Sequence, residues 1–379
     1  MDFSQQVLFV IIRKYTKDGG LFMSTYASSK KEYAGIDIAK IICAYLVVAI
    51  HIPVFGPSEN ESIKLLDFAI SNCLARIAIP FFFVASGFFL FRKMTPEHFD
   101  AVPARKYVLR ILRLHILWTL IYLPLSISLM RENGHFLGGS MVLEFIRNFF
   151  LTGSYTHLWY MNALIFDVIF ISILLKNRIS PRHIFTFSLV MYIIGLFGDA
   201  YFGMIAPLAT KLPGFWNVLH QLHIIFDTTR NGLFDGMLFV SIGMLFAFDS
   251  SLISGKDKTR RYFLLSLAAL VVEVFLLNHY NIPRDYNMMI SLIPCAFFGF
   301  SYFLQVDANP DHNYKKIRTL SAIIYYVHLW VGEIVREMLA ERCAFLLYPL
   351  SAVFSTLLGI FLIWLSSHKK CRWVKNLYS

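Results

Sequence analysis

Four ionisable residues interrupt two apolar stretches near the start of the chain. Asp37, Lys40 and His51 lie in IDIAKIICAYLVVAIHIPVF. Arg76 lies in the second stretch, FAISNCLARIAIPFFFVASGFFLF. If the first stretch is helical, Lys40 and His51 fall within about 20° of one another around its axis, and Asp37 lies about 40° from His51 on the other side. An acid, a base and an imidazole on one helix face are groups for proton transfer, nucleophilic attack or ion pairing.

The composition predicts what surrounds these residues. Of the 379 residues, 57% are hydrophobic and 16% are charged, and the mean hydropathy is +0.59. Soluble domains carry about 25% charged residues, so we predict an all-α integral membrane protein. Ionisable side chains at the centre of a membrane helix cost about 2.5–3.5 kcal/mol each on insertion scales, and those that persist usually have a partner or a function.

About ten transmembrane helices fit the apolar pattern of the chain. We place them near 36–55, 68–91, 108–130, 156–176, 184–204, 232–250, 262–281, 287–306, 319–338 and 346–366. Both termini are predicted to be cytoplasmic, because most of the 35 Lys and Arg then fall in cytoplasmic segments. The same asymmetry explains the net charge of +11, so membrane lipid is the expected partner and nucleic acid is not.

The chain divides into three predicted regions. Residues 1–35 are expected to be a disordered cytoplasmic arm, 36–366 the transmembrane domain, and 367–379 a basic cytoplasmic tail. The segment 142–153 is too short to span and is expected to lie as an amphipathic helix in the outer interface. The five cysteines show no paired spacing, so neither a disulfide framework nor a metal site is expected.

Orientation assigns depths to the polar residues of the first three spans. His51 comes late in an outward-running helix and Arg76 midway in an inward-running one, so both are expected in the outer half. Lys40, Arg110 and Arg113 are expected near the cytoplasmic face. At 1.5 Å per residue, Lys40 and His51 are about 16 Å apart along the helix. The sequence therefore predicts an inner basic cluster and an outer His/Arg pair.

Three polar residues of later spans are candidate substrate contacts. His157 stands beside Trp159 at the outer start of one span, Asp235 lies in the outer half of another, and His328 lies within a third. Each has an alternative role as an interhelical hydrogen-bond partner. His157 beside a tryptophan is also typical of an interfacial aromatic belt.

The spacing of these residues and several short sequence segments resemble the acyltransferase-3 family of membrane-bound acyltransferases. Asp37-x-x-Lys40, followed eleven residues later by His51, is similar to that family's opening helix, which usually has Asp-x-x-Arg and then a His. Further matching segments, in order, are AIPFFFVASGFF (78–89), LRILRLH (109–115), HLWYMNALI (157–165), TRNGLFDGMLFVSIGM (229–244) and SAIIYYVHLW (321–330). Lys40 departs from the family pattern because it keeps the charge but lacks the guanidinium fork. His115 stands where a proline is common.

The resemblance implies an enzyme of a bacterial plasma membrane that moves an acetyl group from cytoplasmic acetyl-CoA, with no metal. The acceptor would be a hydroxyl of an extracytoplasmic glycan, glycolipid or cell-wall polymer. In that scheme Lys40, Arg110 and Arg113 bind the phosphates of CoA. His51 deprotonates the acceptor hydroxyl or accepts the acyl group, and Arg76 stabilises the oxyanion. Asp37 would be a structural ion-pair partner of Lys40.

Alternatives of other classes stay open at this point. The sequences of the second and sixth spans are also similar to the membrane half of vancomycin-resistance serine racemases. This similarity favours a transporter or binding module for a small amino acid such as serine. A catalytically silent assembly partner is a third reading. Arg110 and Arg113 could be positive-inside anchors, and Arg76 could pair with Asp235 or another acid to cancel a buried charge.

Overall fold

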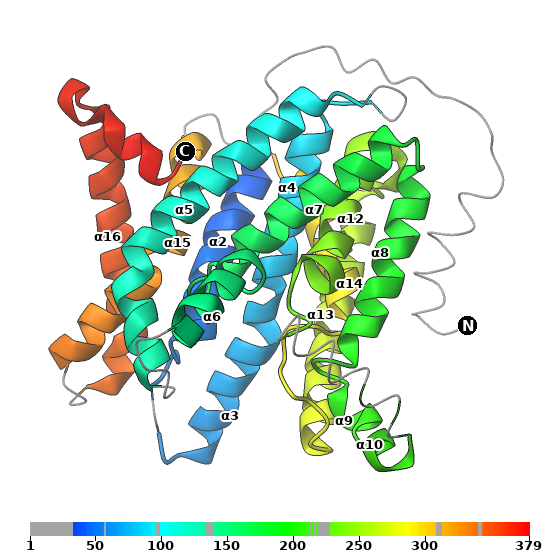
Figure 1. The fold of residues 1–379 in the computed structure, drawn as a ribbon, viewed down its shortest axis with the longest axis horizontal. Helices are drawn as coiled ribbons and strands as arrows, with labels where there is room; N and C mark the ends of the chain where they lie inside the picture. Colours follow the sequence, from blue (N-terminus) through cyan, green and yellow to red (C-terminus); the bar gives the residue numbers. More distant parts are fainter. Residues whose placement is uncertain are drawn as a thin grey trace.

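The computed structural model describes residues 33–379 apart from 57, 96–98, 133–138, 213, 215–216, 218–227, 308–312 and 340–342. Within this described part the chain is helical and contains no strand, so the predicted all-α class is confirmed. The long helices lie side by side in one bundle, with α16 at one flank and α8 at the other (Figure 1).

The α-helices vary widely in length. In chain order they are α2 (Ala34–His51), α3 (Glu61–Ala69), α4 (Ala78–Phe91), α5 (Ala101–Glu132), α6 (Gly139–Phe150), α7 (Trp159–Lys176), α8 (Pro181–Leu196), α9 (Phe202–Ile205), α10 (Leu208–Lys211), α12 (Met237–Phe248), α13 (Lys256–His279), α14 (Leu292–Leu304), α15 (Tyr314–Leu339) and α16 (Leu347–Ser367). Shorter π- and 3₁₀-segments are η1 (Ile70–Leu74), η2 (Ala75–Ile77), η3 (Gly232–Gly236), η4 (Ser250–Leu252), η5 (Ala344–Leu346) and η6 (Lys369–Leu377).

Six helical segments among the described residues are long and apolar enough to cross a membrane. They are Ala34–His51, Glu61–Phe91, Ala101–Glu132, Trp159–Lys176, Lys256–His279 and Ala344–Ser367. Three further apolar helices, Pro181–Leu196, Gly232–Phe248 and Leu292–Leu304, are shorter. Together with α15, these helices overlap each of the ten predicted spans. The membrane character is supported, whereas ten crossings and cytoplasmic termini stay predictions.

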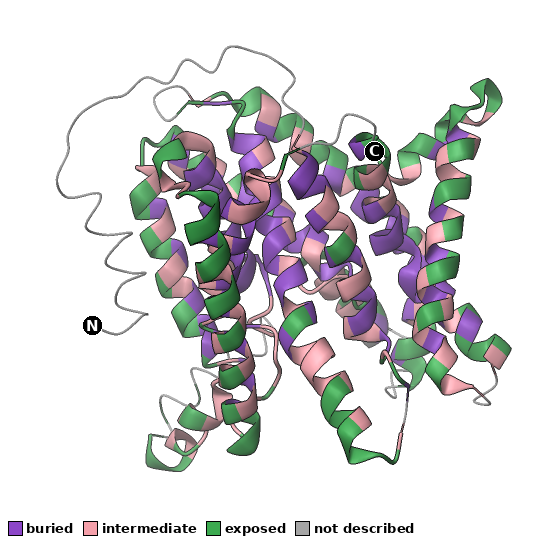
Figure 2. Ribbon diagram, turned by 180° about the vertical axis from the view of Figure 1, so that it is seen from behind, coloured by how far each residue is buried: buried purple, intermediate pink, exposed green. Residues whose placement is uncertain are grey.

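The core of the bundle lies where α2, α4, α12 and α15 meet, and buried residues concentrate there rather than on the flanking helices (Figure 2). Helices α4 and α12 approach at backbone distance. A Cβ on Gly87 would overlap the Val240 carbonyl, and one on Gly243 would overlap the Val84 carbonyl. Small residues let helix backbones pack closely in a membrane, so these two glycines determine the tightest contact of the core.

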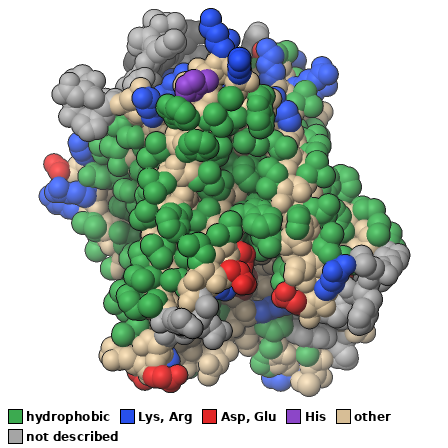
Figure 3. Space-filling model, turned by 90° about the vertical axis from the view of Figure 1, so that its left-hand side faces the viewer, with side chains coloured by type: hydrophobic (Ala, Val, Ile, Leu, Met, Phe, Trp, Pro, Cys, Tyr) green, Lys and Arg blue, Asp and Glu red, His purple; other side chains and the backbone are tan. Residues whose placement is uncertain are grey.

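The surface carries a broad apolar band (Figure 3). Large exposed hydrophobic residues such as Leu120, Leu264 and Leu357 belong to the outward faces of α5, α13 and α16. Lys and Arg side chains gather above the band in this view, at the end where the C-terminus lies in Figure 1. This is the end that the positive-inside rule assigns to the cytoplasm, and we call it the inner end. The opposite end is the outer end.

Regular helix is interrupted at three places in the bundle. The π-helix η1 and the 3₁₀-helix η2 join α3 to α4, and the π-helix η3 precedes α12. A largely non-helical segment, residues 280–291, connects α13 to α14. Irregular backbone at membrane depth is tolerated where protein groups or a cavity satisfy its amides, and π-segments are frequent at functional sites. These interruptions therefore indicate where a site is to be sought.

The predictions for the two ends of the chain and for residues 142–153 compare with the structure in different ways. The expected arm over residues 1–35 falls almost entirely outside the described residues, although α2 already begins at Ala34. The predicted amphipathic helix at 142–153 is present as α6. The basic tail forms η6 and packs back on the bundle, where Trp118 Nε1 donates to the Leu377 carbonyl over 2.8 Å.

Candidate active site

One cavity, which we call the outer cavity, gathers residues that are far apart in the sequence. It is narrow, with about 30 Å³ open to the centres of water-sized molecules. Its walls are Val47, Ile50, His51, Arg76, Ile79, Pro80, His157, Trp159, Arg230, Asp235, Asn287 and Tyr325. The structure thus brings together four of the residues predicted from the sequence, His51, Arg76, His157 and Asp235, and adds Arg230 and Asn287, which sequence reasoning missed.

Three imidazoles cluster at the wall of this cavity. The ring centroid of His328 lies 5.4 Å from that of His51 and 5.3 Å from that of His157. His328 Nδ1 lies 2.9 Å from the Tyr325 carbonyl oxygen and 3.2 Å from that of Ile324. Because carbonyls only accept, this nitrogen carries the proton. Nε2 then has a free lone pair, and within the described residues it is buried without a hydrogen-bond partner.

His157 is an internal residue and not an interfacial one. Its relative exposure is 2%, which contradicts the aromatic-belt alternative. Its ring contacts those of Tyr122 and Tyr325, with centroid distances of 4.7 Å and 5.3 Å. In the described part of the chain neither ring nitrogen has a hydrogen-bond partner. Buried polar atoms are normally paired, so this imidazole is available to a ligand or a proton.

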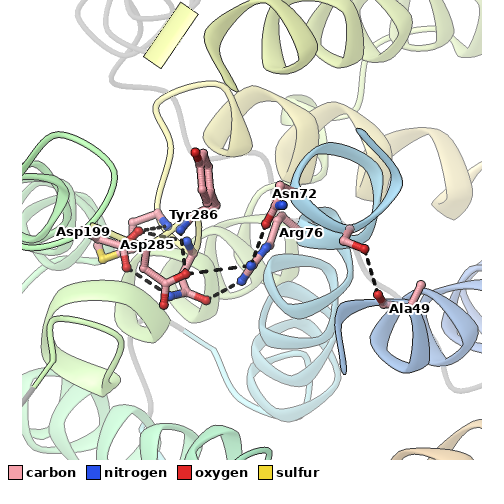
Figure 4. Close-up of polar contacts among 9 residues, drawn as sticks. Ala49, Asn72, Arg76, Asp199, Asp285 and Tyr286 are labelled. Carbon is pink, nitrogen blue, oxygen red and sulfur yellow. Dashed lines mark hydrogen bonds and ion pairs between the residues drawn. The ribbon is translucent and has the colours of Figure 1, made fainter. Parts of the chain in front are cut away.

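Arg76 is fixed by amide side chains (Figure 4). Its Nη1 donates to Asn287 Oδ1 over 2.6 Å, and its Nη2 donates to Asn72 Oδ1 over 2.9 Å. The nearest carboxylate oxygen, Asp285 Oδ1, lies 3.8 Å from Nη2. Of the acids that the sequence analysis allowed for Arg76, the partner among the described residues is therefore Asp285 and not Asp235. Arg76 keeps a fixed orientation, and its charge is only partly balanced.

The segment that carries Asn287 is anchored by two acids, the buried Asp199 and the partly exposed Glu273. Asp199 Oδ1 accepts from the backbone amides of Asn287 (2.8 Å) and Met288 (3.0 Å), while its Oδ2 accepts from Asn287 Nδ2 (3.1 Å). Glu273 accepts from the amides of Ile290 and Ser291 over 2.7 Å and 2.8 Å. Carboxylates thus satisfy amides that a helix would have satisfied itself. As a result Asn287 is held between Asp199 and Arg76.

The π-helix η3 directs Asp235 into the cavity. Asn231 caps the helix, because its Oδ1 accepts from the Phe234 amide over 3.1 Å. Glycine at 232 and 236 lets this turn press against α7, where a Cβ on Gly232 would lie only 2.8 Å from Asp167 Oδ1. Asp235 itself is 3% exposed and lines the cavity.

Arg230 also lines the cavity, and it has no ion-pair partner among the described residues. Its guanidinium carbon is 5.2 Å from the centre of the Trp159 ring, a cation–π arrangement. No carboxylate of the described residues forms an ion pair with it, and its Nε is buried without a partner. The sequence analysis does not name Arg230, although it is the second residue of the matched segment TRNGLFDG.

The inner end carries a basic cluster, Lys40, Arg110, Arg113 and Arg318, which we call the inner cluster. Lys40 Nζ lies 4.7 Å over the Phe89 ring, and the charges of Arg110 and Arg318 both reach it. Asp37, 2% exposed, forms its ion pair with Arg318 at 3.5 Å. The structural role expected for Asp37 therefore involves a residue from α15 that the sequence analysis did not name.

The two cluster arginines of α5 have different surroundings. Arg110 is exposed and lies 5.2 Å over the Tyr107 ring. Arg113 is also exposed and donates to the backbone oxygen of Ser379. His115, which departs from the family pattern, is 1% exposed, and its Nε2 lies 3.1 Å from the Phe149 carbonyl. His115 thus packs between α5 and α6.

A row of side chains that carry hydroxyl groups lies between the two ends, and we call it the hydroxyl line. Its inner member is Tyr107, whose hydroxyl interacts with Ser86 and Arg110. Ser86 Oγ lies 3.1 Å from the Tyr160 hydroxyl. The Tyr160 ring is 5.7 Å from that of Tyr325, which lines the cavity and whose hydroxyl donates to the His157 carbonyl over 2.7 Å.

Fold and site together define a class: a helical membrane protein with a buried His/Arg cavity near one end and a basic cluster at the other. The model of a family described as an acyltransferase domain matches residues 33–367. The chain belongs to this acyltransferase-3 family.

The chain is also similar to curated proteins that are longer than itself. It is 32% identical over 298 residues to a serine/alanine racemase of Enterococcus gallinarum, which covers 78% of the chain and 40% of that protein. It is 30% identical over 278 residues to an amino-acid racemase of Enterococcus faecalis, covering 73% and 36%. The chain therefore spans about two fifths of the length of these relatives. No solved structure matches.

Proposed function

We propose that this protein transfers an acetyl group from cytoplasmic acetyl-CoA to a hydroxyl of an extracytoplasmic glycan, glycolipid or cell-wall polymer. Family membership supports acyl transfer as the reaction class. The observation that carries the finer proposal is the convergence of His51, His157 and His328 with Arg76 at one cavity.

In the proposed reaction His51 is the general base. It takes the proton of the acceptor hydroxyl as the oxygen attacks the thioester carbonyl. The C–S bond then breaks, and the thiolate takes the proton back from His51 to leave as the free thiol. His328 has its proton fixed on Nδ1, so its Nε2 lone pair faces the cluster and stabilises the imidazolium of His51. Arg76 faces the oxyanion of the tetrahedral intermediate and stabilises its charge.

The donor is proposed to enter from the inner end. Lys40 and Arg110 offer charges for the phosphates of CoA, whereas Arg113 already has a contact with Ser379. Along α2, Lys40 and His51 are about 16 Å apart, a span that a pantetheine arm can reach. The hydroxyl line from Tyr107 to Tyr325 supplies polar contacts along the way.

Binding or transport of a small amino acid is the second candidate. Guanidinium groups and a carboxylate, Arg76, Arg230 and Asp235, line the same cavity, and a zwitterion presents the complementary charges. The racemase names of the relatives agree with an amino acid as ligand. On this reading the three imidazoles have no chemical role, which is why acyl transfer is favoured.

Purified protein in proteoliposomes tests the proposal. We expect turnover of acetyl-CoA by the wild type, loss of turnover with retained binding in His51→Ala, and weakened binding in Arg110→Ala/Arg113→Ala. If the wild type does not bind acetyl-CoA but takes up serine, the transport function replaces the enzyme.

A further inference from the structure

We propose that Arg230 binds a carboxylate group of the extracytoplasmic ligand, so that the acceptor is an anionic hydroxyl compound and not a neutral sugar. The position of the carboxylate would then determine which hydroxyl reaches His51. The inference that the bound compound accepts an acyl group rests on the proposed function, whereas the inference that Arg230 binds a carboxylate does not.

The first argument is the contrast between the two arginines of the outer cavity. Arg76 has two amide acceptors and a nearby carboxylate, Asp285. Arg230 lies half-buried and forms no side-chain hydrogen bond or ion pair with any described residue. A guanidinium removed from water is costly unless an anion pairs with it. A ligand that enters the cavity is the available source of that anion.

The second argument is the orientation of the guanidinium. The guanidinium carbon lies 5.2 Å over the ring of Trp159, which is 6% exposed. This contact gives the N–H groups no hydrogen-bond acceptor, and a guanidinium edge matches a carboxylate through two parallel hydrogen bonds. The indole therefore holds the guanidinium at the cavity wall and leaves its donors to a carboxylate.

The third argument is the balance of charge in the cavity. Of its described lining residues, Arg76 and Arg230 are cationic and Asp235 is anionic. Asp235 is not within ion-pair distance of either arginine in the described structure. An anionic ligand group would complete this balance. Arg230 and His51 line the same cavity, so an anion bound by Arg230 would lie in the cavity that holds the proposed base.

Protection of Arg230 from chemical modification tests the site on the wild-type protein. Phenylglyoxal labelling in nanodiscs is followed residue by residue by mass spectrometry, with acetate, acetamide or methyl phosphate added at fixed ionic strength. We expect acetate to slow the labelling of Arg230 and its neutral isostere acetamide to leave it unchanged. Labelling of the exposed Arg131 serves as the reference. Protection by methyl phosphate alone, or by none of the three, overturns the carboxylate assignment.

A variant separates this inference from the proposed function. Arg230→Gln should raise the concentration of acetate needed for thermal stabilisation by about tenfold, as expected for loss of a charge-assisted pair, and Arg131→Gln should not. In a transfer assay Arg230→Gln should raise KM for the acceptor and leave acetyl-CoA binding unchanged. If acetate protects Arg230 but the protein does not turn over acetyl-CoA, the proposed enzyme function fails and the anion site stands. If the protein turns over acetyl-CoA but acetate does not protect Arg230, the anion site fails and the enzyme function stands.

Discussion

The outer cavity and the inner cluster differ in how the chain builds them. The cavity lies among irregular segments, η1–η2, η3 and residues 280–291, and its charged side chains are largely buried. The inner cluster lies on regular helices, and Arg110, Arg113 and Arg318 are exposed. Groups that are buried and fixed before a reaction stabilise a transition state more effectively than mobile ones. Exposed charges contribute affinity that falls with salt.

This difference gives each region its own experimental signature. Substitutions in the outer cavity should lower kcat, because they disturb groups oriented for the chemical step. Substitutions in the inner cluster should raise KM for acetyl-CoA and weaken its salt dependence, because they remove charge that water and ions already screen.

The largest expected effect is that of His51→Ala. Removal of the general base should lower kcat by about 10²–10⁴-fold while acetyl-CoA binding is retained. Single-turnover transfer in proteoliposomes measures the first, and equilibrium binding measures the second. His183→Ala is the matched control, because His183 is exposed on α8 and contacts Ser180. Full activity in His51→Ala would refute the assignment of the outer cavity as the catalytic region.

Asn287→Ala should have the next largest effect. It removes the acceptor 2.6 Å from Arg76 Nη1 and leaves the guanidinium free to turn toward Asp285. A hydrogen bond to a charged group is worth about 1.5–3 kcal/mol, so kcat should fall by about one to two orders of magnitude. Asn278→Ala, at an exposed asparagine bonded to Tyr286, is the control. A change in KM for acetyl-CoA alone would show that Asn287 does not position Arg76.

The contrast between regular helices and irregular segments also explains how much of this site the sequence could predict. His51 and Arg76 were placed at one depth because helical rise and the positive-inside rule convert sequence position into depth. His157, Asp235 and His328 were named, but nothing in the sequence said that the three imidazoles meet.

Other parts depend on tertiary structure that leaves no periodic signal. Asn287 lies on a non-helical segment held by the distant Asp199, and the pattern of apolar residues predicts a plain helix there. Asp37 pairs with Arg318, on a helix near the other end of the chain. Arg230 precedes a π-turn whose glycines admit the Asp167 carboxylate. Helical periodicity identifies spans, but not the groups that interrupt them.

In the inner cluster, Arg110→Ala/Arg113→Ala should raise KM for acetyl-CoA by about tenfold through loss of charge-assisted phosphate contacts, with kcat unchanged. The single change Arg113→Ala should act less, since its side chain already donates to Ser379. Binding measured from low to high salt checks both. Arg260→Ala is the control, because Arg260 is exposed and pairs with Asp257 at 3.5 Å. A loss of kcat here would remove the distinction between the regions.

The smallest effects are expected between the two regions, along the hydroxyl line. Ser86→Ala and Tyr160→Phe each remove one partner of the 3.1 Å contact, and a neutral hydrogen bond is worth about 0.5–1.5 kcal/mol. We expect each to slow acetyl-CoA turnover by about two- to tenfold, with Ser188→Ala, a buried serine bonded to its own helix, as the control. The double variant is the sharper test. If the line is a continuous contact for the donor, the two effects should not add, whereas additive losses would mean that the inner cluster and the outer cavity are reached by separate paths.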